Sequence, residues 1–300
     1  MDSPAVAAPV TEALACQRPV VALESALITH GFSAPANLRI ALRMESAVLE
    51  EDALPATIAV LDGKPHIGLS DRELERLASM PVCRKISLRD LAIVAAQGDS
   101  GGTTVAATMH LAQRAGIQIL ATGGIGGVHR DHPEDVSADL TALGSIPIIV
   151  VCSGAKAILD LPRTLEILET LGVPVVGFGT EDFPAFYSRR SGLKADAAVD
   201  TAAEVAEVAR MRRQLGLSAA ILVCVPVPEE GALAPREMEA AIDSAMAQAD
   251  EAGVSGKDLT PFLLGRVVQL TRGKAQRANE TLLVNNARVA ARIARALVDV

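Results

Sequence analysis

The chain has no tryptophan and only one tyrosine and five phenylalanines among its 300 residues. Half of its residues are nevertheless hydrophobic, so the core must consist of Ala, Val, Leu and Ile. This composition is typical of parallel α/β proteins, whose strands are covered on both faces. A chain of this length can bury a core large enough to fold independently.

Three further features are lacking: paired cysteines, a basic charge excess and long apolar runs. The cysteines have no C-x-x-C spacing, which argues against a disulfide scaffold or a zinc site. A formal net charge of −8 argues against a general nucleic-acid binder. No apolar run approaches the roughly 18 residues of a membrane span, and the first residues lack the pattern of a signal peptide. We expect a soluble, cytoplasmic protein that acts on a small molecule, without a nucleic-acid or membrane partner.

Short apolar runs that alternate with amphipathic segments predict a mostly parallel or mixed sheet between two helical layers, an α/β/α arrangement. The expected strands are Val20–Leu23, Leu91–Ala96, Ile117–Ala121, Ile146–Cys152, Val173–Phe178 and Ala219–Val227, with a hairpin of Ala56–Leu61 and Pro65–Gly68 around Asp62-Gly63-Lys64.

Helices are expected after Ser33-Ala34-Pro35, at Asp71–Ala78 with Ser70 as cap, at Thr103–Ala115, after SGAK as far as Leu171, and at Pro235–Ala252, Pro261–Thr271 and Asn279–Val300. No linker divides the chain, so we predict one domain over residues 20–300, after an N-terminal lead-in at residues 1–19.

Ligands of open α/β sheets bind beyond the carboxyl ends of the strands. Glu24, the loop GDSGG, the loop TGGIGG from Thr122 and the loop SGAK ending at Lys156 all follow expected strands. Glycine allows backbone N–H groups to approach a phosphate, and a helix N-terminus adds partial positive charge. These loops predict a site for a phosphorylated small molecule, although ordinary turn glycines would give the same pattern.

Three charged residues near these loops are candidates for chemistry. Lys156 follows an apolar run that would favour its neutral, nucleophilic form, but it could also be an exposed lysine at a helix start. Glu24 at an apolar strand end could act as a general acid or base, or be an ordinary strand-end glutamate. Lys85 could hold phosphate as a point charge, or belong to a solvated basic cluster with Arg84 and Arg89.

The segment DVSAD has two interpretations. Asp135 and Asp139 could bind a hard divalent cation, which takes oxygen ligands and retains several waters. Ser137 with Asp139 could instead be an N-cap followed by a first-turn acid, which leaves Asp135 unexplained. His129 and His132 could be metal ligands or phosphate donors, but the sequence has no histidine spacing that indicates zinc.

The chain resembles the pseudouridine-5'-phosphate glycosidase family, which is related to indigoidine-synthase-A-like proteins. The resemblance extends from about Val20 to the end of the chain. It is carried by the motifs VALES (21–25), THG (29–31), PATIAV (55–60), KISLRDL (85–91), GGTTVAATM (101–109), ATGGIGGVHR (121–130), DVSADL (135–140), VVCSGAKAILDL (150–161), GVPVVGF (172–178), PFLLGRV (261–267) and NNA (285–287).

The resemblance implies reversible cleavage of the C–C glycosidic bond of pseudouridine 5'-phosphate to uracil and ribose 5-phosphate. It implies Lys156 as the nucleophile that forms an adduct at ribose C1' and Glu24 as the proton donor. It further implies a homotrimer and one Mn²⁺, or another divalent cation, bound at Asp135 in each subunit. The expected substrate-binding residues are Lys85, Val105, Ser137, Ala138, Asp139, Thr122, His129 and Asn279.

Two other functions fit the same residues. One is a different Schiff-base lyase or aldolase on a sugar phosphate, which would share Lys156 and the glycine loops. The other is an accessory protein that binds a sugar phosphate without turnover. Turnover that depends on a nucleobase would distinguish the glycosidase from another lyase or aldolase. Any turnover would distinguish it from the accessory protein.

Overall fold

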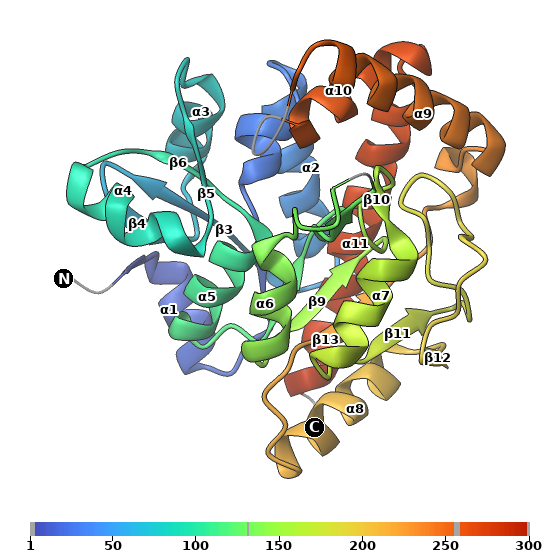
Figure 1. Cartoon of the computed structure of the whole chain (residues 1–300). Helices are drawn as coiled ribbons and strands as arrows, with labels where there is room; N and C mark the ends of the chain where they lie inside the picture. The colour runs from blue at the N-terminus through green and yellow to red at the C-terminus, as the bar shows by residue number, and fades with distance from the viewer. Residues whose placement is uncertain (1–3, 131, 255–258, 299–300) are drawn as a thin grey trace.

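The computed structural model describes residues 4–130, 132–254 and 259–298 (Figure 1). The main sheet has the strand order β1-β4-β3-β2-β7-β9-β13-β11-β12, and β6 pairs with both β3 and β5. A separate antiparallel pair consists of β8 and β10. The strands are β1 Ala5–Val6, β2 Val20–Leu23, β3 Leu54–Leu61, β4 Lys64–Ile67, β5 Arg84–Ile86, β6 Gly101–Thr103, β7 Ile119–Ala121, β8 Val128–His129, β9 Ile149–Cys152, β10 Leu159–Asp160, β11 Val175–Phe178, β12 Ala197–Val199 and β13 Ile221–Cys224.

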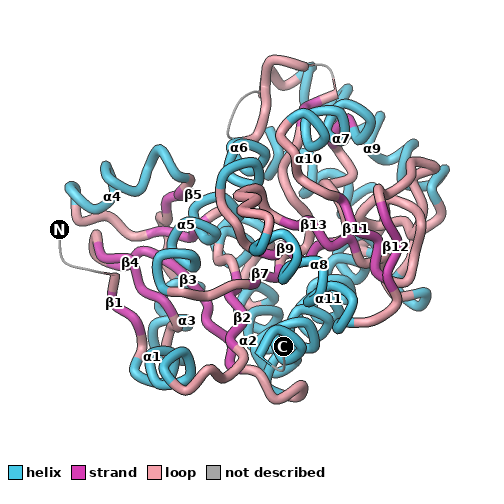
Figure 2. The backbone as a smooth tube through the Cα atoms, turned by 90° about the horizontal axis from the view of Figure 1, so that it is seen from below, coloured by secondary structure: helices cyan, strands magenta, loops and turns pink. Residues whose placement is uncertain are grey.

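Helices cover both faces of this sheet, with α5, α6 and α7 on one side and α2, α8 and α11 on the other (Figures 1 and 2). The helices are α1 Ala8–Ala15, α2 Ala36–Leu49, α3 Asp71–Ser79, α4 Leu91–Gln97, α5 Val105–Ala115, α6 Ala138–Ser145, α7 Leu161–Thr170, α8 Ala202–Gln214, α9 Pro235–Glu251, α10 Leu259–Leu270 and α11 Lys274–Val298. Short turns of other types are the π-helical η1 Leu27–Gly31 and the 3₁₀ segments η2 Leu88–Asp90 and η3 Glu229–Gly231.

The central strands lie in parallel and are buried on both faces. Every residue of β2, β7, β9 and β13 is buried, and β2, β7, β9, β13, β11 and β12 all run parallel to their neighbours. The antiparallel pairings lie at the β3–β6 end of the sheet. The expected α/β/α fold in one domain is therefore confirmed, with a mixed sheet built mainly from Ala, Val, Leu and Ile.

A small lobe projects from the β3 end of the sheet and contains β4, β5, β6, α3 and α4 (Figure 1). The hairpin predicted around Asp-Gly joins β3 to β4, with Leu61 opposite Lys64 and φ values of 49° at Asp62 and 76° at Gly63. Two positive φ angles in a two-residue loop are the requirement that Asp-Gly meets. Ser70 caps α3 through a full capping box, as predicted.

The expected strand at Leu91–Ala96 is wrong, because these residues form α4. A short apolar run does not by itself distinguish a strand from a helix. The capping box between Ser87 and Asp90 starts the turn that leads into α4, and of its apolar residues only Val94 is buried. The loop GDSGG consequently follows a helix and leads into β6, instead of following a strand and opening a helix.

Other elements differ at their limits. The helix expected from Thr103 begins at Val105, because Thr104 is its N-cap and Thr103 ends β6. The helix expected directly after SGAK begins only at Leu161, after β10. β7, β9, β11 and β13 are shorter than expected, and β12 and α8 were not predicted. Residues 299–300 of the last predicted helix lie outside the described residues.

The N-terminal residues expected as a lead-in contain β1, which pairs with β4, and α1, which buries Val10 and Ala13. The proposed domain boundary at residue 20 stays a prediction. Among the described helices, none is both long enough and apolar enough to cross a membrane.

Candidate functional site

The predicted site lies where three parallel strands end. Leu23 of β2 pairs with Ala121 of β7, and Ala121 pairs with Val151 of β9, so these strands end at nearly the same level. Glu24, Thr122 and Ser153 follow directly. A pocket opens beside them and is lined by Glu24, Ala26, Leu27, His30, Gly31, Phe32, Lys85, Gly123, Gly124, Lys156, Phe186, Thr260, Pro261, Leu264, Asn279 and Leu283.

Glu24 is a buried carboxyl group at this pocket. Its Oε1 accepts a hydrogen bond of 2.8 Å from the hydroxyl of Thr122, which is itself fully buried. Burial raises the pKa of Glu24 and outweighs the positive charge of Lys156 and the Thr122 hydrogen bond, which both lower it. A carboxyl group with a raised pKa is suited to donate a proton, as the sequence analysis anticipated.

Two lysines reach the same pocket from different parts of the fold. Lys156 lies in the loop after β9, where its backbone N–H donates to the carbonyl of Ile125 at 3.1 Å. It is half-buried and precedes α7 by several residues, so the alternative of an exposed lysine at a helix start is wrong. Lys85 lies on β5 of the small lobe. Burial, and next the charge of Lys156, lower the pKa of Lys85.

Asp139, in the first turn of α6, connects this helix to the start of α5 and to the glycine loop. Its Oδ1 accepts the backbone N–H of Ala106 in the first turn of α5, at 3.0 Å, and its Oδ2 accepts that of Gly126 at 2.8 Å. Ser137 is the N-cap of α6, and its hydroxyl accepts the N–H of Asp139. The capping interpretation is therefore confirmed for this pair, and Asp139 also orients the glycine loop.

Val105 and Ala138 are the first residues of α5 and α6, respectively. The N-termini of these two helices carry partial positive charge, and the Asp139 carboxylate is the anion that the structure places there. Among the described residues, neither Val105 nor Ala138 belongs to the lining of the Glu24 pocket, and neither do Ser137 and Asp139. Their predicted role in substrate binding stays a prediction.

The glycines of the loop 122–127 are required for close packing. A Cβ at Gly126 would overlap the side chain of Ser137, and one at Gly124 would lie 2.6 Å from the ring of Phe186. The same holds at Gly102, where a Cβ would overlap Thr29. Without side chains at Gly102, Gly124 and Gly126, the backbone can lie close to Thr29, Phe186 and Ser137. Neither a plain turn nor phosphate binding alone would require glycine for such close packing.

His129 and Asp135 are neighbours at the outer edge of the site. His129 Nε2 lies 3.9 Å from Asp135 Oδ2 and 3.5 Å from the hydroxyl of Thr260, while its buried Nδ1 has no hydrogen-bond partner among the described residues. Burial lowers the pKa of His129, against the raising effect of Asp135. His132 points to Glu134 instead, with 3.4 Å between Nδ1 and Oε1.

No group of three or more His, Cys, Asp or Glu side chains within the described part of the chain is arranged to hold a metal ion. Asp135 is partly exposed, and His129 is the adjacent donor. This donor set does not fit a closed protein cage. A hard cation held by Asp135 would have to complete its shell with water and substrate oxygens.

The lining of the Glu24 pocket also includes several apolar side chains. Among them are Phe32, Phe186, Leu264 and Leu283, and Asn279 of α11 supplies an amide. Asn279 thus lines the same pocket as Glu24 and Lys156, and its role in binding the base stays a prediction. Phe186 and His30 also line the pocket but were not predicted from the sequence. Phe186 lies in an irregular segment after β11. For His30, the THG motif was the available signal.

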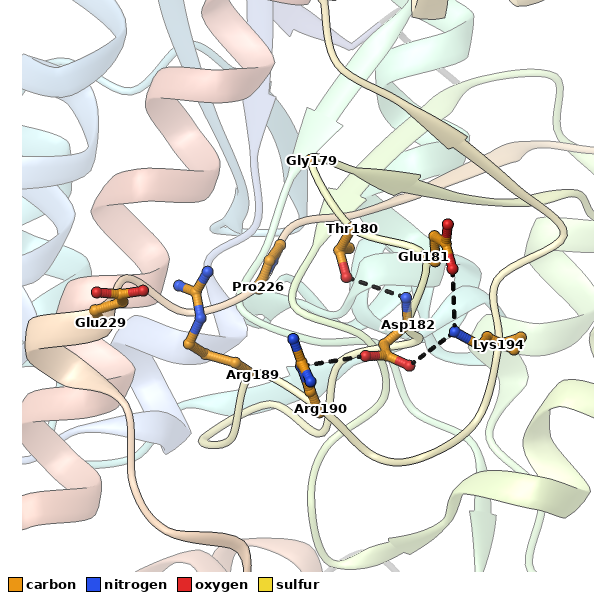
Figure 3. Close-up of a pocket in the computed structure, with 9 residues that line it drawn as sticks. All are labelled: Gly179, Thr180, Glu181, Asp182, Arg189, Arg190, Lys194, Pro226 and Glu229. Atoms are coloured by element: carbon orange, nitrogen blue, oxygen red, sulfur yellow. Dashed lines mark hydrogen bonds and ion pairs between the residues drawn. The ribbon is translucent and has the colours of Figure 1, made fainter.

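A second pocket lies beyond the ends of β11 and β13 and is lined by Gly179, Thr180, Glu181, Asp182, Arg189, Arg190, Lys194, Pro226 and Glu229 (Figure 3). Its cavity volume of about 470 Å³ exceeds the 70 Å³ of the Glu24 pocket. However, its charges are largely paired. Asp182 contacts both Arg190 and Lys194, at 3.5 and 3.6 Å, and Arg189 donates to the carbonyl of Val227. None of the residues predicted from the sequence lies there, so the smaller pocket is the candidate site.

The fold and the Glu24 pocket together define an α/β enzyme whose polar groups lie at the carboxyl edge of a parallel sheet. The chain belongs to the indigoidine synthase A like family, whose model matches residues 9–296.

Several curated relatives are similar over nearly their whole length. A pseudouridine-5'-phosphate glycosidase of Rhizobium johnstonii is 51% identical over 97% of this chain and 95% of its own. One of Caldanaerobacter subterraneus is 53% identical over 95% of this chain and 94% of its own. These names agree with the family that the sequence motifs indicated.

Two solved structures share the fold. The crystal structure of the prealnumycin C-glycosynthase AlnA in complex with ribulose 5-phosphate has a TM-score of 0.92 and 38% identity, and the match covers 100% of this chain and 98% of that one. An indigoidine synthase A like protein from Thermotoga maritima has a TM-score of 0.89 and 37% identity, with 94% of each chain covered. The neighbour with a bound sugar phosphate is consistent with a small-molecule site.

The substitution Asp139→Asn should destabilise the protein by about 1–3 kcal/mol, because one of the two backbone N–H groups that the carboxylate accepts would face an amide donor. Urea denaturation followed by circular dichroism measures the change. Asp160→Asn is the matched control, since Asp160 caps α7 by accepting the N–H of Arg163, asparagine caps equally well, and the variant loses only an ion pair with the half-exposed Arg163 guanidinium at 3.4 Å. Equal stability of the two variants would contradict this account of Asp139.

Proposed function

We propose that this chain reversibly cleaves pseudouridine 5'-phosphate to uracil and ribose 5-phosphate. The observation that carries the proposal is a buried carboxyl group of raised pKa, Glu24, in the same pocket as two lysine amines, Lys156 and Lys85. The relatives at about 50% identity support the choice of substrate.

The bond to be broken joins two carbon atoms, so uracil must leave with an electron pair on C5. In the proposed reaction the Nζ of Lys156 bonds to C1', the C1'–O4' bond breaks, and the ammonium proton passes to O4'. The nitrogen lone pair then forms C1'=N, the bond from C1' to C5 breaks, and Glu24 protonates C5. Water adds to the iminium and releases ribose 5-phosphate and the lysine amine.

The remaining residues bind and orient the substrate in this proposal. Lys85 faces the anionic part of the sugar phosphate as a point charge. Phe186 and Asn279 contact the base, one through its ring and the other through its amide. Thr122 holds the carboxyl group of Glu24 in the orientation from which it reaches C5.

A divalent cation, with Mn²⁺ as the expected one, is part of the proposal and would be held by Asp135 with His129 as the neighbouring donor. When bound, it would neutralise charge on the sugar phosphate. A homotrimer is also part of the proposal and rests on the family resemblance alone.

Another lysine-dependent enzyme of sugar phosphates is the second candidate function, favoured by the similarity to a C-glycosynthase solved with ribulose 5-phosphate. Such an enzyme would use the same lysine and a different acceptor in the same pocket. Formation of pseudouridine 5'-phosphate from uracil and ribose 5-phosphate, with Mn²⁺ present, distinguishes the two. Absence of product in both reaction directions would overturn the glycosidase proposal.

Borohydride reduction in the presence of ribose 5-phosphate should attach the sugar phosphate to Lys156, and mass spectrometry of peptides should locate it there. Lys156→Ala should lose the label and all measurable turnover. Lys85→Ala should bind ribose 5-phosphate more weakly yet still be labelled at Lys156, because Lys85 supplies charge only. Label on Lys85 in the wild-type protein would refute the assigned roles.

Glu24→Gln should lower kcat for cleavage by about 10²–10⁴-fold while labelling of Lys156 by ribose 5-phosphate persists, because only the proton donor is removed. In the wild type, cleavage needs protonated Glu24, so kcat should fall as pH rises through its raised pKa. Glu45→Gln is the matched control, since burial also raises the pKa of Glu45, which bonds Thr57 outside the pocket. A normal kcat in Glu24→Gln would rule out the proposed donor.

Asp135→Asn should weaken Mn²⁺ binding by about tenfold or more, as measured by calorimetry with ribose 5-phosphate present, because it removes the anionic ligand. Glu134→Gln, which changes an exposed carboxylate one residue earlier, should leave the affinity unchanged. Equal affinities in the two variants would show that the cation, if bound, lies elsewhere.

A further inference from the structure

Asn286 is a buried amide on the apolar face of α11. Its flanking residues Leu282, Leu283, Ala287 and Ala290 are also buried, and the helix packs on β2, β7 and β9. A buried amide is costly unless its hydrogen bonds are made. The position of Asn286 in the motif NNA therefore requires an explanation that core packing does not give.

The side chain of Asn286 reaches both loops of the site. Nδ2 donates to the carbonyl of Thr122 at 2.9 Å and lies 3.4 Å from that of Gly123. It also donates to the hydroxyl of Ser153 at 3.1 Å, and that hydroxyl lies 3.3 Å from Oδ1. One side chain thus bonds to the first residue after β7 and to the first residue after β9.

Each of these contacts leads to a residue of the proposed chemistry. The hydroxyl of Thr122 donates to Glu24, and Ser153 begins the loop that ends at Lys156. The two loops are also joined by backbone bonds, from Ser153 N–H to Gly123 and from Lys156 N–H to Ile125, at 2.8 and 3.1 Å. Asn286 adds side-chain hydrogen bonds to this ladder of backbone bonds between the two loops, at the point where the regular strands end.

We propose that Asn286 is a positioning residue that fixes the proton donor Glu24, through Thr122, relative to the nucleophile Lys156, through Ser153. The inference rests on the proposed function for the roles of these two residues. It gives Asn286 of the NNA motif a role other than substrate binding or core packing. A shift of about 1 Å between reacting groups costs on the order of 10²-fold in rate.

Asn286→Ala should lower kcat by about 10²-fold and change the KM for ribose 5-phosphate by less than about threefold, because the binding groups Lys85 and Asn279 are untouched. Asn285→Ala, one residue earlier on the same helix and half-buried, should leave both constants unchanged. Val205→Ala, in the buried part of α8, supplies a variant that is destabilised without contact to the loops. A kcat for Asn286→Ala within twofold of the kcat for Val205→Ala would overturn the proposal.

Ser153→Ala removes the contact of Asn286 with the loop that ends at Lys156 and leaves its contact with Thr122. It should slow labelling of Lys156 by about tenfold, and adding it to Asn286→Ala should have little further effect, since both remove the same link. Fully additive losses would show that Asn286 and Ser153 act independently and would contradict the proposal.

Amide hydrogen exchange tests the positioning without any turnover. In Asn286→Ala the N–H groups of Thr122, Ser153 and Lys156 should exchange at least about tenfold faster than in Asn285→Ala, because the ladder between the loops opens more often. Unchanged exchange would overturn the inference even in an active enzyme. If the wild-type protein is inactive on pseudouridine 5'-phosphate but the two variants still differ in exchange, the proposed function is overturned and the link from Asn286 to the two loops stands.

Discussion

Burial of the Glu24 carboxyl group is the constraint on which the rest of the site depends. An ionised carboxylate at the end of a buried strand would be costly, so the group either retains its proton or finds compensating charge. The protein supplies a hydroxyl from Thr122 and a positive charge from Lys156, and the pKa nevertheless stays raised. The loops after β7 and β9 must therefore be held close to the end of β2, which accounts for glycines that admit no Cβ and for a buried amide on α11.

Much of this arrangement followed from the sequence. Buried apolar runs without aromatic residues predicted the parallel strands, and polar residues directly after those runs predicted the edge at which Glu24, Thr122 and Lys156 meet. Periodicity of this kind reports burial on both faces of a sheet, and strand direction then determines where the ends meet. The family resemblance named the individual roles, which the residues alone left open.

The small lobe could not be predicted in the same way. α4 is a short apolar run, and its helical signals are its alanines, the capping box of Ser87 and Asp90, and the left-handed Gly98 at its end. The contact of Asn286 with Thr122 and Ser153 joins residues more than 130 positions apart, and no local pattern encodes such a distance. Phe186 was missed for a related reason, since its place against Gly124 depends on an irregular segment that has no periodicity.

Val60 of β3 packs with Ile86 and Val94 of the small lobe in a hydrophobic cluster. Lys85 precedes Ile86 on β5, whereas Glu24 and Lys156 extend from the main core. β5 is nevertheless joined to the main core through β6, because Thr103 of β6 accepts the backbone N–H of Ser25, the residue after Glu24. A change in the packing of the lobe would therefore shift Lys85 and the strand end that carries Glu24 together.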